Sequence, residues 1–282
     1  MTSSQVNKKI LALHFSGSAR KYDTEATLQR EIAFQTAQLA CLSENGGQAV
    51  VPRVLEIGCG TGFLTSFLLE RIKCELVVAV DLSDGMLCRA GQNLGRLSPP
   101  VRLVQADGEQ LPLAGGSFDL VVSSTTFQWF EDLDSALGAI RRVLRPGGRL
   151  VFATLLRGTF RELRESYRAA AGSLGIRLTA SRYGLTLPGA QEVRDLLHQH
   201  GFGGIETREQ AKFEYFPSAV DFLRSIKARG GNNPNFRPMS LPVERALLKK
   251  MTSFYNDRFR IDGRVCVTYE VIFAQASVLS RK

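Results

Sequence analysis

The sequence predicts an α/β protein built on an open, mostly parallel β-sheet with helices on both faces. Three observations support this. Short apolar, β-rich segments alternate with helical segments through the first 155 residues, which places consecutive strands parallel. A glycine-rich turn follows the first of these strands. The composition, 44% hydrophobic and 22% charged over 282 residues, is that of a globular chain able to bury a full core.

The first half of the chain supplies five strands in order. A helical region covers residues 13–43, where apolar side chains recur at helical spacing, and the Glu-Asn-Gly-Gly segment at 44–47 ends it. A strand at 54–57, a helix at 63–73, a strand at 76–80 and a helix at 83–95 follow. Strands at 101–105 and 118–123, a helix at 132–144 and a strand at 149–154 complete the alternation. Proline-containing breaks at 98–100 and 146–148 separate elements.

The regular alternation ends after residue 154. Helices are expected at 159–174, 190–200, 218–228 and 241–255, a strand near 204–215, a loop at 230–235 and a last β-rich segment at 265–274. We expect three parts: an N-terminal helical cover (1–45), a core carrying the glycine-rich turn (46–156), and a remainder (157–282). That remainder completes the core with its last strands and carries an inserted helical cap over the substrate.

Composition excludes several classes of protein. The longest uncharged stretches, such as 120–130, are too short to span a membrane, and residues 1–10 lack an apolar export signal. The five cysteines form no C-x-x-C pair, as is usual for reduced thiols in the cytoplasm. Three scattered histidines indicate no metal site. We therefore expect a cytoplasmic protein that contacts no membrane and holds no metal.

Charge is distributed unevenly along the chain. Residues 1–150 contain 15 Lys and Arg against 15 Asp and Glu, whereas residues 151–282 contain 21 against 12. The whole net charge of +9 therefore lies in the second half. It is either an ordinary solvated surface or a docking face for an anionic partner. No RNA-binding signature is present, so composition alone does not identify the partner.

The main chemical signal is the segment EIGCGTG at 56–62, which joins a strand to a helix. Glycines permit a tight turn and let a ligand approach the backbone, while the helix N-terminus carries partial positive charge. A tight turn with no ligand is the alternative explanation. The spacing is G-x-G-x-G rather than G-x-G-x-x-G, which disfavours a dinucleotide.

Acidic residues lie at the ends of three strands in succession: Glu56, Asp81 and Asp107. Asp81 is placed to accept hydrogen bonds from both ribose hydroxyls of a nucleoside, and Asp107 to accept one from an adenine amino group. Each residue could instead cap a turn or a helix. Together they are expected to line one crevice at the carboxyl edge of the sheet. Carboxylates suit a cationic nucleoside without phosphate, because Glu56 would repel a pyrophosphate.

Five motifs, taken as a set, resemble the class I S-adenosylmethionine-dependent methyltransferases. They are LEIGCGTG at 55–62, VDLS at 80–83, ADGE at 106–109, FDLV at 118–121 and LRPGG at 144–148. The resemblance covers about residues 55–154. It implies a Rossmann-like, seven-stranded sheet that ends in an antiparallel hairpin, with the segment at 265–274 as one strand. It also implies S-adenosyl-L-methionine as cofactor and S-adenosyl-L-homocysteine as product. The cofactor-binding residues would be Phe15, Tyr22, Glu56, Gly58, Cys59, Gly60, Gly62, Asp81, Leu82, Ser83, Met86, Asp107, Gly108, Glu109, Ser124 and Thr125.

A narrower resemblance extends over most of the chain. The patterns F-x-x-x-A-x-x-Y-D at 15–23, FQW at 127–129, L-x-x-x-K-x-x-GGNN at 223–233 and VTYEV at 267–271 are similar to the malonyl-[acyl-carrier protein] O-methyltransferases of biotin synthesis. Gly231 departs from the Ala that this family often has. The implied reaction methylates the free carboxylate of a malonyl thioester. The resulting ester has lost its charge, so fatty-acid elongation enzymes can accept it as the primer for pimelate.

The implied reaction needs little acid–base chemistry. A carboxylate with a pKa of about 4 is already ionised at neutral pH, so we propose no general base. Tyr22 is the candidate for positioning donor and acceptor, or else it anchors the N-terminal helix. Gln128 and Trp129 follow the fourth strand, where the acceptor is expected, although Trp129 could also be ordinary core. The candidates for binding the carboxylate or a phosphopantetheine phosphate are Lys227, Arg229 and Arg237, any of which could instead be a surface charge.

The implied partner is an acyl carrier protein bearing malonyl-phosphopantetheine, or malonyl-coenzyme A, which shares the same arm. The positive second half would dock an acidic carrier. A methyltransferase of another small metabolite or quinone is an alternative, although an aromatic acceptor would need a base and no His follows the fourth strand. A non-catalytic module with a relic nucleoside pocket is an alternative of another class. Methylation of a nucleic acid is a third alternative, which predicts strongly salt-dependent binding of RNA or DNA; a nucleic-acid partner is not expected.

Overall fold

A single mixed sheet organises the computed structural model, which describes residues 7–41, 49–95, 99–178, 186–234 and 239–279. The strand order is β5-β4-β2-β6-β7-β10-β8, and the short β9 pairs with β10. Strands β5, β4, β2, β6 and β7 are parallel, whereas β10 is antiparallel to both β7 and β8. The strands are β2 (Arg53–Ile57), β4 (Leu76–Asp81), β5 (Val101–Gln105), β6 (Phe118–Ser124), β7 (Leu144–Leu155), β8 (Phe202–Phe216), β9 (Arg260–Ile261) and β10 (Arg264–Val278). This confirms the α/β class and the antiparallel hairpin.

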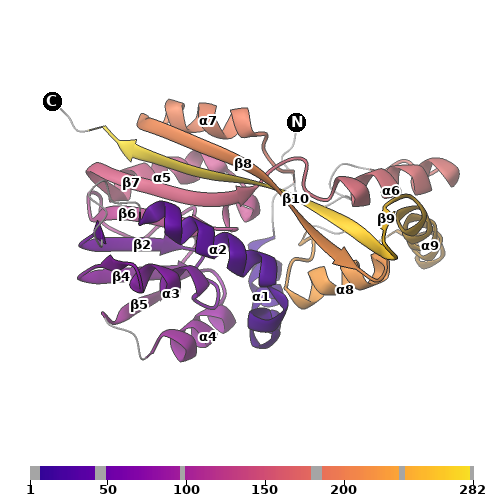
Figure 1. Cartoon of the computed structure of the whole chain (residues 1–282), viewed down its shortest axis with the longest axis horizontal. Coiled ribbons are helices and arrows are strands. Elements are labelled where there is room, and N and C mark those ends of the chain that lie inside the picture. The colour runs from indigo at the N-terminus through magenta and orange to yellow at the C-terminus, as the bar shows by residue number, and fades with distance from the viewer. Residues whose placement is uncertain (1–6, 42–48, 96–98, 179–185, 235–238, 280–282) are drawn as a thin grey trace.

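Helices cover both faces of this sheet (Figure 1). Successive strand residues point to opposite faces, so Val54 packs with α2 (Thr27–Ala40) and α3 (Phe63–Leu69). Leu55 lies in the other core, with α5 (Leu133–Val143) and α7 (Ala190–Gln199). Both side chains are fully buried, as expected for a strand covered on two sides.

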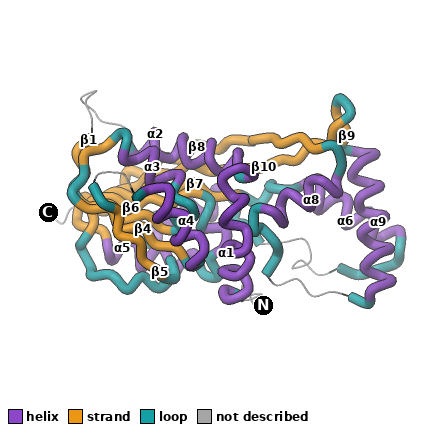
Figure 2. The backbone as a smooth tube through the Cα atoms, turned by 90° about the horizontal axis from the view of Figure 1, so that it is seen from below, coloured by secondary structure: helices purple, strands orange, loops and turns teal. Residues whose placement is uncertain are grey.

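The helical cap projects from one end of the sheet, as Figures 1 and 2 show. It contains α6 (Arg161–Ser173), α8 (Ala219–Ala228) and α9 (Leu241–Arg258), packed on the far halves of β8 and β10. Each of these two strands is 15 residues long, enough to serve both the core and the cap. The core of the cap includes Phe222 and Tyr255, and it also contacts Leu28 and Ile32 of α2. The division of the chain at residues 45 and 156 stays a prediction.

Two helices expected in the first half were wrong in their extent. The helical region at 13–43 is two helices, α1 (Lys8–Glu25) and α2, which are separated at Ala26; residues 44–47 lie outside the described part. The helix expected at 63–73 is α3, which ends at Leu69. The last two residues of the expected helix instead form the strand β3 (Ile72–Lys73), which pairs in parallel with β1 (Ala49–Val50). Ile72 continued the apolar helical spacing, but it is buried beside an exposed Lys73, as in a strand.

The Pro-Gly-Gly segment at 146–148 does not separate a helix from a strand. Strand β7 begins at Leu144 and contains this segment. Leu144 pairs with Phe118, the register then shifts, and regular pairing resumes at Arg149. A proline without an N–H is tolerated at such an irregularity. The segment therefore makes a bulge within a strand.

The other predicted elements are confirmed except at their ends, including α4 (Asp84–Leu94) for the helix expected at 83–95. Residues 231–234 form no helix or strand, as expected for the loop, whereas Ser98 and Asn235 lie outside the description. No described helix is both long and apolar enough to cross a bilayer. The described side chains also contain no group of three metal-ligating residues.

Candidate active site

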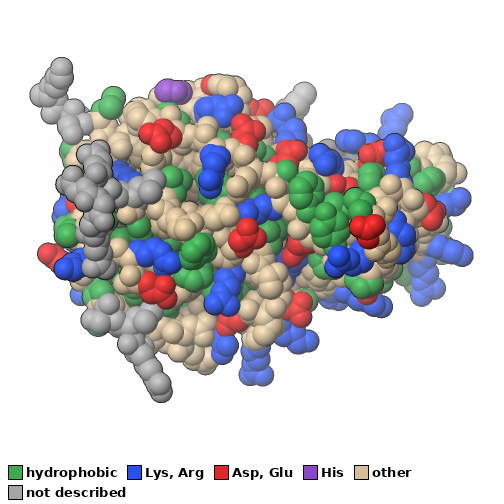
Figure 3. Space-filling model, in the orientation of Figure 1, with side chains coloured by type: hydrophobic (Ala, Val, Ile, Leu, Met, Phe, Trp, Pro, Cys, Tyr) green, Lys and Arg blue, Asp and Glu red, His purple; other side chains and the backbone are tan. Residues whose placement is uncertain are grey.

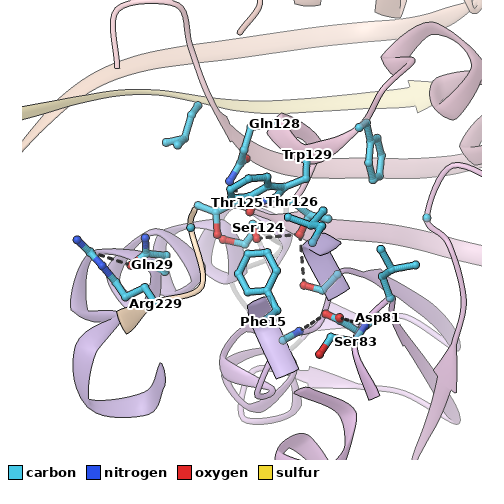
Figure 4. A pocket seen from close by; sticks show the side chains of 18 of the residues that line it. Phe15, Gln29, Asp81, Ser83, Ser124, Thr125, Thr126, Gln128, Trp129 and Arg229 are labelled. Carbon is cyan, nitrogen blue, oxygen red and sulfur yellow. Dashed lines mark hydrogen bonds between the residues drawn. The ribbon is translucent and has the colours of Figure 1, made fainter. Parts of the chain in front are cut away.

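A large cavity opens where the carboxyl ends of β4, β5 and β6 face the cap. Its volume is about 1520 Å³, counting the solvent-filled mouth. Helix α1 and the 3₁₀ helix η1 (Phe127–Trp129) line it from the core, and α6 and α8 line it from the cap. In Figure 4, Phe15 of α1, Gln128 and Trp129 of η1, and Arg229 at the end of α8 lie around it. The position matches the rule that ligands of open α/β sheets bind at the carboxyl ends of the strands.

The three glycines of the first turn serve different purposes. Gly60, with φ of +53°, has nothing within 4 Å of where a Cβ would be, so its backbone is open to the cavity. Gly58 packs tightly, since a Cβ would lie 2.1 Å from Thr126 Oγ1. Gly62 begins α3 with φ of +94° and packs against Leu94. Gly62 lines neither this cavity nor its smaller neighbour, and its expected role in cofactor binding stays a prediction.

Asp81, at the end of β4, ties the glycine turn to the next helix. Its Oδ2 accepts a hydrogen bond from Gly60 N at 2.8 Å, and its Oδ1 accepts one from Ser83 N at 2.8 Å. Ser83 in turn caps α4 by accepting from Met86 N. Burial raises the pKa of Asp81, opposed by these backbone donors. The carboxylate is held rigidly at the cavity wall, as a ribose-binding residue requires.

Asp107 and Glu109 share an ion pair with Lys8 of α1. Lys8 Nζ lies 2.5 Å from Asp107 Oδ2 and also pairs with Glu109. Burial opposes the lysine charge, but the two carboxylates outweigh it and raise the pKa of Lys8. Asp107 Oδ1 also accepts a hydrogen bond from Glu109 N at 3.0 Å, so Asp107 caps this turn as well as lining the cavity. All three side chains line the cavity, and this acidic pair suits a hydrogen-bond donor or a cation.

Glu56 does not share the crevice of Asp81 and Asp107. It is 1% exposed and accepts a hydrogen bond from Thr65 Oγ1. It lines an adjoining smaller cavity together with Cys59 and Thr61. Burial raises the pKa of Glu56 to about 8, opposed by the Thr65 hydrogen bond. The expected single crevice is therefore two adjoining cavities, which share Tyr22, Gln29, Gly58, Gly60, Ser124 and Thr125.

Tyr22 lies at the junction of the two cavities. Its ring packs against Phe63, with centroids 6.2 Å apart, so it also anchors α1 on the core. Burial raises the pKa of Tyr22, which keeps the phenol protonated. Both roles considered for this residue are therefore compatible with its place.

The end of β6 forms a polar ridge between core and cap (Figure 4). Thr125 has φ of +52°, an unfavourable conformation for a β-branched residue. Gln128 holds it by donating to Thr125 O at 2.5 Å, and Gln128 Oε1 accepts from Thr154 Oγ1 at 3.1 Å. Trp129 packs edge-on against Phe15 at 5.4 Å. Among described residues, the buried Ser124 Oγ has no hydrogen-bond partner, so it is available to a ligand.

Cations predicted for substrate binding fall in three different places. Arg229 lines the cavity but is only 4% exposed and pairs with both carboxylate oxygens of Glu214, at 3.1 and 3.0 Å. Tyr269 donates to Glu214 and accepts from Arg229, which completes this network. Lys227 is exposed on α8 and is not part of the cavity wall. Arg237 lies outside the described residues.

The remaining expected cofactor residues line the main cavity: Phe15, Leu82, Ser83, Met86 and Gly108. Sequence reasoning missed Lys8, Gln29, Arg164 and Tyr269. Tyr269 stood inside the quoted VTYEV motif, but nothing in the sequence signalled that it faces the cavity. The available groups are carboxylates, the buried Ser124 hydroxyl and the open backbone at Gly60. This set fits S-adenosylmethionine, a cationic nucleoside without phosphate.

Comparisons with known proteins agree with this geometry. A family model described as a methyltransferase domain matches residues 55–152. The malonyl-[acyl-carrier protein] O-methyltransferase of Geobacter sulfurreducens is 36% identical over 92% of this chain and 94% of its own length. The proteins of the same name from Paenibacillus sp. and Acetivibrio thermocellus are 32% and 33% identical, over 92% and 98% of this chain and 94% and 95% of their own lengths.

Solved structures share the fold. The YcgJ protein of Bacillus subtilis aligns with a TM-score of 0.61 and 16% identity, over 89% of this chain and 99% of its own. A methyltransferase-like protein from Bacillus halodurans gives 0.59 and 21%, over 88% and 99%. The sequence relatives span the cap as well as the core. The chain therefore belongs to the malonyl-[acyl-carrier protein] O-methyltransferase family of class I S-adenosylmethionine-dependent methyltransferases.

Proposed function

We propose that this chain methylates the free carboxylate of a malonyl thioester carried by acyl carrier protein, with S-adenosylmethionine as donor. The products are the malonyl methyl ester, which primes pimelate synthesis for biotin, and S-adenosylhomocysteine. The observation that carries the proposal is similarity to malonyl-[acyl-carrier protein] O-methyltransferases along 92–98% of the chain, cap included.

The core would hold the cofactor, which supplies an electrophilic methyl group on a sulfonium centre. Asp81 would accept hydrogen bonds from the ribose hydroxyls and Asp107 one from the adenine amino group. Glu56, in the smaller cavity, would face the cationic amino group of the methionyl end. The open backbone at Gly60 leaves room for close approach.

The cap would hold the acceptor beside the polar ridge of β6. Leu155, Phe160, Leu187 and Ile226 supply apolar walls here. An ionised carboxylate needs no proton removed, so the chain's task is to align it and exclude water. Tyr22 and Gln128 flank the junction and would fix the position of the acceptor oxygen.

Exposed cations on the cap would dock the carrier protein. Figure 3 shows Lys and Arg side chains gathered at the cap end of the molecule. Those on α8 and α9 include Arg224, Lys227, Arg245, Lys249 and Lys250, all of them exposed. We call these five residues the cap cations. An acidic carrier would be attracted to them and oriented with its arm toward the cavity.

A labelled-methyl assay tests this proposal. The purified chain is incubated with methyl-labelled S-adenosylmethionine and, separately, malonyl-acyl carrier protein, malonyl-coenzyme A, acetyl-acyl carrier protein, and a panel of quinones and small metabolites. We expect a base-labile labelled ester on the malonyl thioesters and none on the acetyl control. Label on a panel compound, with none on either malonyl thioester, would contradict the proposal. The ratio between the two malonyl substrates shows which carrier is used.

A further inference from the structure

The acceptor part of the cavity contains a cation that forms no salt bridge with a described carboxylate. Among the described residues that line the cavity, the cationic side chains are those of Lys8, Arg164 and Arg229. Lys8 is paired with Asp107 and Glu109, and Arg229 is paired with Glu214. Arg164 forms no salt bridge with any described acidic residue. Among the described lining cations, Arg164 is therefore the one placed to form an ion pair with a bound ligand.

Main-chain carbonyls hold the Arg164 guanidinium in place. It lies in the first turn of α6 and is half-buried. Its Nη1 donates to Thr159 O at 2.5 Å, and its Nη2 donates to Arg157 O. These two bonds use two of five guanidinium N–H groups, and no other hydrogen bond to a described residue is formed. The guanidinium is thus fixed in orientation but keeps N–H groups that can donate hydrogen bonds to a ligand.

The neighbouring acidic side chains form no ion pair with Arg164. Glu162 is buried and accepts from both Thr268 N and Thr268 Oγ1. The Glu270 carboxylate lies over Gly158, where a Cβ would be within 2 Å of it, and it makes no salt bridge with any described residue. Burial lowers the pKa of Arg164 and the positive charge of Arg168 lowers it further, while the charges of Glu270 and Glu162 only partly offset this. A cation in this state gains more from an incoming anion than an exposed one does.

We infer that Arg164 binds the carboxylate of the acceptor and selects for its charge, an inference that rests on the proposed function. Contact through one carboxylate oxygen leaves the other to attack the methyl group. The C–O bond forms as the methyl–sulfur bond breaks, and the electron pair of that bond stays on sulfur. The carboxylate thereby becomes a neutral ester. Because the anionic charge fades along the reaction, this contact stabilises bound substrate more than the transition state. Loss of Arg164 should therefore raise KM rather than lower kcat.

The test compares Arg164→Gln with Arg168→Gln, an exposed arginine on the same helix outside the cavity wall. With malonyl-acyl carrier protein we expect R164Q to raise KM by about 10-fold or more, with kcat within about 3-fold of wild type. R168Q should change KM less than about 3-fold. Arg164→Lys, which keeps the charge, should recover part of the affinity and guards against misfolding of R164Q.

Binding, measured without turnover, separates this inference from the proposed function. Trp129 is the only tryptophan and lines the cavity, so its fluorescence reports occupancy in protein loaded with S-adenosylhomocysteine. Wild type should prefer malonyl- over acetyl-pantetheine, and R164Q should lose that preference while binding acetyl-pantetheine as before. An unchanged preference, or a fall in kcat at unchanged KM, would overturn the inference. If wild type forms no malonyl ester, the proposed function fails, whatever the outcome of this binding measurement.

Discussion

At the scale of single residues, the site depends on carboxylates held in different states by their surroundings. Asp81 is fixed by two backbone donors at the cavity wall, whereas Glu56 is sealed behind the glycine turn against Thr65. Asp107 is partly exposed and is already paired with a lysine. The three carboxylates thus lie in three different electrostatic environments.

Replacing Asp81 with Asn should weaken cofactor binding. The amide would turn an NH₂ group toward a backbone N–H donor and would lose one acceptor for the ribose. A hydrogen bond to a charged group contributes about 1.5–3 kcal/mol, so affinity for S-adenosylhomocysteine should fall by about 10- to 100-fold. Calorimetric titration measures this, with the exposed Asp134→Asn on α5 as control. Equal affinities in D81N and wild type would contradict the assigned role.

Cofactor affinity should increase with pH through the range set by Glu56. Its pKa is raised to about 8 by burial, so its carboxyl is mostly protonated at neutral pH. A cationic amino group beside it favours the anion, so binding releases a proton and is weaker below pH 8. We expect affinity to rise several-fold from pH 6.5 to 8 and then level off. Glu56→Gln should flatten this profile. A wild-type profile as flat as that of E56Q would count against the assignment.

At the scale of elements, the acceptor wall depends on how α8 packs into the cap. Phe222 is fully buried and lies against Phe160, Phe216 and Tyr255. Its neighbour Phe160 lines the cavity directly. The contacts that stabilise the cap therefore also determine the shape of the acceptor site.

Phe222→Ala should destabilise the protein and loosen the acceptor site. Truncation of a buried phenylalanine costs about 3–5 kcal/mol of unfolding free energy. Chemical denaturation measures that loss, and steady-state kinetics should show KM for the malonyl substrate rising more than Kd for S-adenosylhomocysteine. Val220→Ala, on an exposed side of α8, is the control. Parallel losses of acceptor and cofactor affinity would show that the cap does not act independently of the core.

The local sequence predicted helices and strands correctly where a pattern was compatible with only one type of element. The alternation of strands and helices and the turn at 56–62 sufficed to place Asp81 and Asp107 at one sheet edge. Ile72 misled because one apolar residue suits a helix face and a short buried strand equally. Pro146 misled because a proline can end a helix or occupy a bulge. Arg164 could not be identified, because its hydrogen-bond partners are main-chain carbonyls, which carry no sequence signal, and nothing in the sequence shows that this turn of α6 faces the cavity.

At the scale of the whole molecule, the net charge is distributed unevenly along the chain. The first 150 residues carry no net charge, and the positive excess lies in the part that contains the cap. An S-adenosylmethionine site needs no net positive surface, whereas an acidic carrier protein would be attracted by one. The charge asymmetry would therefore correspond to the division between the cofactor site and the proposed carrier surface.

Added salt should raise KM for malonyl-acyl carrier protein but not KM for the small substrate malonyl-pantetheine. Surface attraction is screened as ionic strength rises, with a Debye length of about 8 Å at 0.15 M and about 3 Å at 1 M. We expect KM for malonyl-acyl carrier protein to rise several-fold over this range while KM for malonyl-pantetheine stays nearly constant. Lys249→Glu with Lys250→Glu should reproduce the effect at low salt. An equal salt response for both substrates would contradict docking on the cap cations.

The most direct measurement is a crystal structure of the chain with S-adenosylhomocysteine and a malonyl-pantetheine analogue. The account predicts ribose hydroxyls on Asp81, the adenine amino group near Asp107, the methionyl end toward Glu56, and the malonyl carboxylate in the cap next to Arg164. A nucleoside bound outside this cavity, or an analogue whose carboxylate points to solvent, would contradict it.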